Sequence, residues 1–147
     1  MRPFKHLFVA LACASFVLGQ FGCKTTENLL SSTQFSDTAY NTDKRLKADS
    51  LALIDQAKNQ TPYNSVADDV NGLMNKIDAT IATEQQRTKN APTVAQWKKI
   101  RTQLTSLFNM WKTKGTLSPT FVDDAREQVS GLFDIWINTE NDKRARP

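Results

Sequence analysis

The sequence predicts an all-α fold, an up-down-up-down four-helix bundle. Three internal prolines, Pro62, Pro92 and Pro119, divide the chain at intervals of 30 and 27 residues, and proline ends a helix but fits the first turn of the next one. Between the prolines, apolar residues recur at spacings of three and four, as on one face of a helix. No run alternates as a half-buried strand would. Because the connections are short, consecutive helices should run antiparallel.

The first predicted helix, before Pro62, has the weakest apolar pattern and begins near Tyr40. Its stripe consists of Leu46, Leu51, Leu53, Ile54 and Ala57. A three-helix core with a loosely docked first helix is therefore the alternative architecture.

The three later segments each carry the stripe of a helix with one buried face. The stripes are Val66, Val70, Leu73, Met74, Ile77 and Ile81; then Val94, Trp97, Ile100, Leu104, Leu107, Phe108 and Trp111; then Val122, Ala125, Val129, Leu132, Phe133 and Trp136. Gly115 lies where the third helix should end. We expect Asp68-Asp69 and Asp123-Asp124 to occupy the first turns of their helices, where negative charge is favourable.

Residues 1–22 have the layout of an export signal. Arg2 and Lys5 precede Leu7–Leu18, an uncharged apolar run of 12 residues, and small residues follow it. A helix that spans a bilayer needs about 20 apolar residues. We therefore expect this segment to be removed after export and not to remain as a membrane span.

The end of this segment resembles the bacterial lipoprotein class, in which a lipobox ends in Gly-Cys or Ala-Cys and the cysteine becomes the first, lipid-carrying residue. Gly22-Cys23 matches that pattern. Gln20 and Phe21 depart from it, because the class has Leu and a small residue at these places. Ordinary signal cleavage after Gly19 is the alternative.

The cysteine count favours the lipoprotein interpretation. Cys13 lies inside the removed segment, so Cys23 has no partner for a disulfide. Acylation would use this lone thiol, and several acyl chains anchor a protein durably. Lys24 stands where many Gram-negative lipoproteins carry the Asp that retains them at the inner membrane. The resemblance thus implies a lipid-anchored envelope protein, at the outer membrane and facing the periplasm.

Four parts of the chain follow from these observations. Residues 1–22 are the signal peptide, residues 23–36 the lipidated N-terminus with a polar, flexible tether, and residues 37–141 the bundle. Asp142–Pro147 should fray as a basic tail.

Composition excludes several functions. Removing the signal leaves 17 basic and 15 acidic residues, a net charge of +2, which gives no support to nucleic-acid binding. The single histidine, His6, is lost with the signal, so imidazole-dependent metal sites and Ser-His or Cys-His catalysis lack their usual group. We expect no cofactor, no metal and no enzymatic activity.

The remaining candidate residues concern an interaction surface. Lys98, Arg101 and Lys112 fall on one face of the third predicted helix, away from its apolar stripe. This face is either a solvated one, partly paired with the acidic fourth helix, or a basic strip for an acidic partner. Trp111 and Trp136 are more typical of core residues, but either ring, if exposed, would extend an interaction surface.

The sequence therefore predicts a non-enzymatic envelope lipoprotein, anchored through Cys23, that acts as a docking or structural module for another envelope protein. The alternative is a bundle that binds a small molecule or lipid through an aromatic cluster of Trp97, Trp111 and Trp136. An enzyme built on carboxylates alone is the third possibility.

Overall fold

A computed structural model of the chain describes residues 34–144, which form four long helices and a short 3₁₀ turn. The helices are α2 (Asp37–Lys58), α3 (Ala67–Gln86), α4 (Ala91–Lys114) and α5 (Pro119–Arg144), and the turn is Tyr63–Ser65. Within this part of the chain there is no strand. The predicted signal peptide, Cys23 and the last three residues lie outside it.

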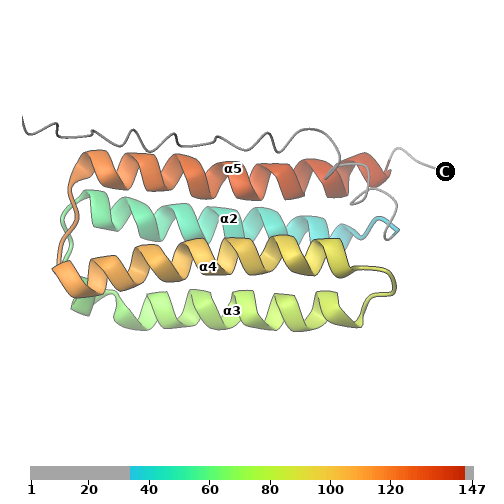
Figure 1. Cartoon of the computed structure of the whole chain (residues 1–147), viewed down its shortest axis with the longest axis horizontal. Helices are drawn as coiled ribbons and strands as arrows, with labels where there is room; N and C mark the ends of the chain where they lie inside the picture. Colours follow the sequence, from blue (N-terminus) through green and yellow to red (C-terminus); the bar gives the residue numbers. More distant parts are fainter. Residues whose placement is uncertain (1–33, 145–147) are drawn as a thin grey trace, which may run out of the picture.

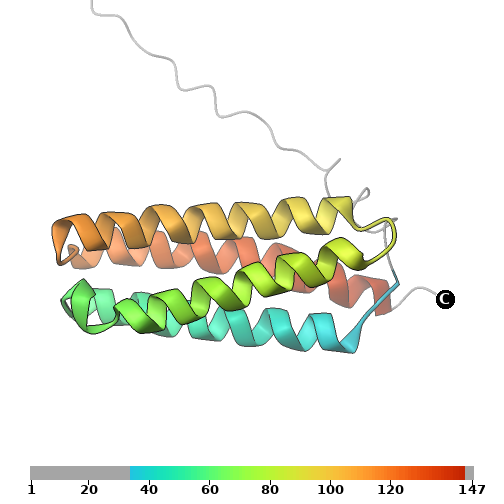
Figure 2. The same ribbon diagram turned by 90° about the horizontal axis from the view of Figure 1, so that it is seen from below.

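Each helix runs antiparallel to the next, and the four enclose a single core (Figure 1, Figure 2). Contacts between α2 and α3, α3 and α4, α4 and α5, and α5 and α2 close the ring. The predicted four-helix bundle is confirmed. Its first helix is not loosely docked, because α2 packs most closely on α5 and buries Leu46 and Ile54 completely.

The helix ends follow local sequence signals. Ser36 caps α2 by accepting a hydrogen bond from the backbone N–H of Ala39. Pro92 and Pro119 lie in the first turns of α4 and α5, where the missing N–H costs nothing. Gly115 ends α4 with a φ of 77°, a left-handed conformation that glycine adopts without strain.

One end of the bundle holds Ser36, the C-termini of α3 and α5 and the start of α4, and we call it the tether end. At the opposite end, the connection between α2 and α3 contacts the end of α4. The N–H of Tyr63 donates to the carbonyl of Gly115, and the indole of Trp111 donates to the carbonyl of Thr61 at 3.0 Å. The rings of Tyr63 and Trp111 pack edge to face.

Ion pairs join α2 to α5 along the bundle. They are Asp37–Arg144, Lys47–Asp134, Asp55–Arg126 and Lys58–Asp123. Asp123 and Asp134 of α5 thus pair with lysines of α2, and not with α4 as the sequence suggested.

Asp68 and Asp69 lie in the first turn of α3 as expected. Asp123 and Asp124 do not lie in a first turn, because α5 already begins at Pro119.

The prediction that a frayed basic tail begins at Asp142 is wrong. Helix α5 continues through Asp142 and Lys143 to Arg144, and the Lys143 side chain is buried. The helix extends because its last turn packs against the start of α2. Among residues 34–144, no helix is both long enough and apolar enough to cross a bilayer.

Candidate functional site

The last residues of the predicted tether are bound to the bundle. The backbone N–H of Ser36 donates to Oε1 of Glu140, and the carbonyl of Gln34 accepts from Arg87 at 2.8 Å. The Phe35 ring lies under the guanidinium of Arg144, 4.4 Å from its ring centroid. The chain is therefore fastened to the tether end from residue 34, and the expected tether is at least three residues shorter than predicted.

Trp111 and Trp136 do not form an interaction surface. Both side chains are completely buried, as is that of Trp97, which packs edge to face on Phe133 at 5.8 Å. The core interpretation of these rings is confirmed. The prediction that Trp111 and Trp136 extend a surface is wrong, because the bundle turns every aromatic stripe inward.

The predicted basic strip on α4 is interrupted. Arg101 forms a two-point ion pair with Asp78 of α3, with 3.0 Å between Nη2 and Oδ2. The mutual hydrogen bonds lower the pKa of Asp78 and raise that of Arg101. Lys98 and Lys112 are exposed. The charge of Arg101 is thus largely neutralised, and the three side chains are not an even positive surface.

A buried ionic group fills the tether end of the core. This tether-end cluster combines three carboxylates with two cations and draws on three helices and the connection after α3. Its members are Asp43 of α2, Glu84 of α3, Arg87 after α3, and Glu140 and Lys143 of α5.

Short bonds connect most of this cluster. Lys143 binds Oε2 of Glu140 at 2.6 Å, while Arg87 binds Oε2 of Glu84 at 2.8 Å and approaches Glu140 at 3.6 Å. The Asn90 amide, at the start of α4, donates to the Glu84 carboxylate and to its backbone carbonyl. Charges this deeply buried are tolerated only when paired and hydrogen-bonded. These bonds join the end of α3, the start of α4 and the last turns of α5, and the hydrogen bond from Ser36 to Glu140 adds the start of α2.

Asp43 is the exceptional carboxyl of this cluster. Its Oδ2 atom is buried and has no hydrogen-bond partner among the described residues. Burial raises its pKa to about 8, and the charges of Glu84 and Glu140 act in the same direction. At neutral pH, a protonated Asp43 leaves two carboxylates opposite the two cations, so the buried charges balance.

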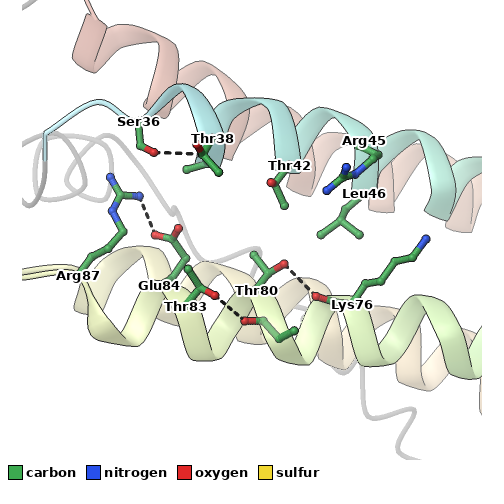
Figure 3. Close-up of a pocket in the computed structure, with 12 residues that line it drawn as sticks. Ser36, Thr38, Thr42, Arg45, Leu46, Lys76, Thr80, Thr83, Glu84 and Arg87 are labelled. Atoms are coloured by element: carbon green, nitrogen blue, oxygen red, sulfur yellow. Dashed lines mark hydrogen bonds and ion pairs between the residues drawn. The ribbon is translucent and has the colours of Figure 1, made fainter.

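A furrow runs along the surface between α2 and α3 beside this cluster. At the tether end the two helices diverge (Figure 2), and a hollow of about 570 Å³ opens between them. Its lining consists mostly of Ser, Thr and Ala side chains with three cations, and Glu84 lies beside Arg87 at the tether end (Figure 3). The lining residues are Ser36, Thr38, Ala39, Thr42, Arg45 and Leu46 from α2 and its cap, and Lys76, Ala79, Thr80, Thr83, Glu84 and Arg87 from α3 and its end.

The furrow continues towards the other end of the bundle as a second hollow of about 320 Å³. Here the charged lining is mainly acidic, with Asp49, Asp68 and Asp69. Lys76 belongs to both hollows and binds Asp49 at 3.0 Å where they meet. We call the whole feature the α2–α3 furrow, with a basic half at the tether end and an acidic half beyond Lys76.

Sequence reasoning missed both the cluster and the furrow, although one signal was available. Asp43 and Ser50 fall on the apolar stripe of α2, between Ala39, Leu46 and Leu53, and both are completely buried. A polar residue in a core position is a sign of a buried polar site. The divergence of α2 and α3 has no such signal.

The described residues offer few other chemical groups. Within residues 34–144, no group of three His, Cys, Asp or Glu side chains could hold a metal ion. No protein-family model, curated protein or solved structure matches the chain.

Proposed function

We propose that this protein is a lipid-anchored, non-enzymatic lipoprotein of the bacterial envelope, and that its bundle docks another protein. Acyl chains on Cys23 would form the anchor, and Gly22-Cys23 followed by Lys24 favours the periplasmic side of the outer membrane. The observation that supports docking is the α2–α3 furrow, a long surface hollow in which small side chains and charged groups lie over buried leucines.

The position of the furrow suits an anchored protein. Gln34 and Ser36 are bound to Arg87 and Glu140, so the segment that leads to Cys23 joins the bundle beside the basic half of the furrow. A bound partner would thus be held close to the membrane surface at high effective concentration.

The other two functions receive less support. A ligand site built on aromatic rings is disfavoured because Trp97, Trp111 and Trp136 fill the core and line neither half of the furrow. A carboxylate enzyme needs carboxyl groups that converge in an open cleft. Glu140 is buried, and its two oxygens accept hydrogen bonds from the Lys143 ammonium of the same helix and from the Ser36 N–H at the start of α2, which is an arrangement that joins the two ends of the bundle.

Two measurements test the proposal. Cys23→Ala should move the protein from the membrane fraction to the soluble fraction and leave its helical circular-dichroism spectrum unchanged. A photo-crosslinking residue at Thr83, in the furrow, should give a discrete crosslinked product in intact cells. The same residue at Thr102, exposed on α4, should give none. Membrane retention of Cys23→Ala, or the absence of any crosslinked protein, would refute the anchored docking role.

A further inference from the structure

We infer that the α2–α3 furrow binds one amphipathic helix of a partner protein, whose charged residues are divided into an acidic half and a basic half. The acidic half of the helix lies at the tether end of the furrow and the basic half at the opposite end. This inference rests on the proposed docking role and specifies the chemistry of the partner.

The shape of the furrow fits a helix. On α2 its lining extends from Ser36 to Gln56, which corresponds to about 30 Å at 1.5 Å per residue. A helix of about 20 residues has that length. Ala39 and Ala79 allow the backbone of a partner helix to approach closely, because small side chains leave little between the two helices.

The surface of the basic half is apolar despite its threonines. The hydroxyl of Thr80 donates to the carbonyl of Lys76 at 2.9 Å, and that of Thr83 donates to the carbonyl of Ala79 at 3.0 Å (Figure 3). These hydroxyl protons are therefore used within α3. The methyl groups of Thr80 and Thr83 and the exposed side chain of Ala79 favour leucine-like side chains over a polar small molecule.

The unpaired charges at the two ends of the furrow determine the direction in which a partner helix binds. In the basic half, the carboxylate of Glu84 is taken up by Arg87 and Asn90, while Arg45 is exposed and has no ion pair among the described residues. In the acidic half, Asp68 and Asp69 are exposed and likewise have no ion pair within the described part. Opposite charges at the two ends of the furrow select a partner with the complementary division, acidic at the tether end and basic at the other, since like charges in juxtaposition are unfavourable.

The test uses two synthetic 20-residue amphipathic peptides labelled with fluorescein. Both have the same leucines and the same numbers of Glu and Lys. In the split peptide, Glu occupies one half and Lys the other, whereas in the mixed peptide they alternate along the length. The protein is purified in a neutral detergent from cells that express the whole chain. Fluorescence anisotropy then measures how tightly each peptide binds to it. We expect the split peptide to bind at least tenfold more tightly than the mixed one.

Matched variants locate the site. Arg45→Glu and Asp69→Lys should each weaken binding of the split peptide at least tenfold, because each places like charge against the peptide. Lys98→Glu on α4 and Glu127→Lys on α5 make the same charge changes at exposed positions outside the furrow, and should alter binding less than twofold. Thr42→Trp should abolish binding by filling the furrow, with circular dichroism confirming that the bundle is folded.

Three results would overturn the inference. The first is equal binding of the split and mixed peptides, and the second is binding that Arg45→Glu leaves unchanged. The third is a tenfold gain in affinity on replacing both Leu29 and Leu30 by Asp, which would assign the furrow to the chain's own N-terminal segment. None of these measurements depends on the anchor. Failure of these peptide measurements, with a discrete crosslinked product still formed at Thr83, would leave the proposed docking role intact.

Discussion

The backbone N–H of Ser36 donates a hydrogen bond to the Glu140 carboxylate, 104 residues further along the chain, at 2.9 Å. The same carboxylate binds Lys143 through its other oxygen. Glu140 thus joins the beginning of the bundle to its last turn.

Glu140→Ala should therefore destabilise the bundle by about 3 kcal/mol, the usual effect of removing one partner from a buried ion pair. Urea unfolding followed by circular dichroism measures the loss. Hydrogen exchange should also accelerate at the start of α2. Glu127→Ala, on the exposed side of the same helix, is the control and should change stability by less than about 0.5 kcal/mol. Equal losses for the two variants would contradict the role assigned to Glu140.

Asp43 makes stability depend on pH. Its pKa is about 8 in the folded protein and lies near the ordinary value of 3.8 in the unfolded chain. Between these two values the folded state holds a proton that the unfolded state has lost. The free energy of unfolding therefore falls as pH rises, by up to about 1.4 kcal/mol per pH unit from this group.

Asp43→Asn removes this dependence, because an amide does not titrate in this range. Urea midpoints at pH 5 and pH 8 should differ less for the variant than for the wild type, and the variant should be the more stable of the two at pH 8. Asp69→Asn, at an exposed position, should behave as the wild type does. If Asp43→Asn and the wild type lost the same amount of stability between pH 5 and pH 8, Asp43 would not be the cause of the pH dependence.

Trp111 should act as a core residue and not as a surface one. Trp111→Ala leaves a cavity and removes the hydrogen bond to Thr61, at a cost of about 3–5 kcal/mol. Met110→Ala, at the partly exposed neighbouring position, should cost less than about 1 kcal/mol. Thermal unfolding of the two variants compares these effects directly. A stable Trp111→Ala variant would disprove the core assignment.

Arg101 and Lys98 should differ although both lie on the same predicted basic face. Arg101→Met breaks the ion pair with Asp78, and we expect a loss of no more than about 1 kcal/mol because both side chains are partly exposed. High salt should reduce this difference from the wild type. Lys98→Met should leave the urea midpoint unchanged at every salt concentration. A salt-independent loss for Arg101→Met would indicate a packing effect instead.

The sequence by itself determined the number, order and approximate limits of the helices. Pro62, Pro92 and Pro119 interrupt helical structure locally, and Gly115 adopts the left-handed conformation that ends α4, so these boundaries depend on residues close in the chain. The apolar stripes of α3, α4 and α5 identified the buried faces for the same reason, since helical periodicity is a local property. The inward position of the tryptophans follows from those stripes.

Only the tertiary structure decided which charged residues are buried and which are joined. Glu84 and Lys143 each look like an ordinary charged residue near a helix end, and their burial depends on the helices that meet there. Arg101 pairs with Asp78 because α4 lies against α3, while Asp123 and Asp134 of α5 bind lysines of α2. The α2–α3 furrow likewise requires two helices to diverge. Contacts between distant parts of the chain depend on the relative placement of whole helices, which a local pattern does not encode.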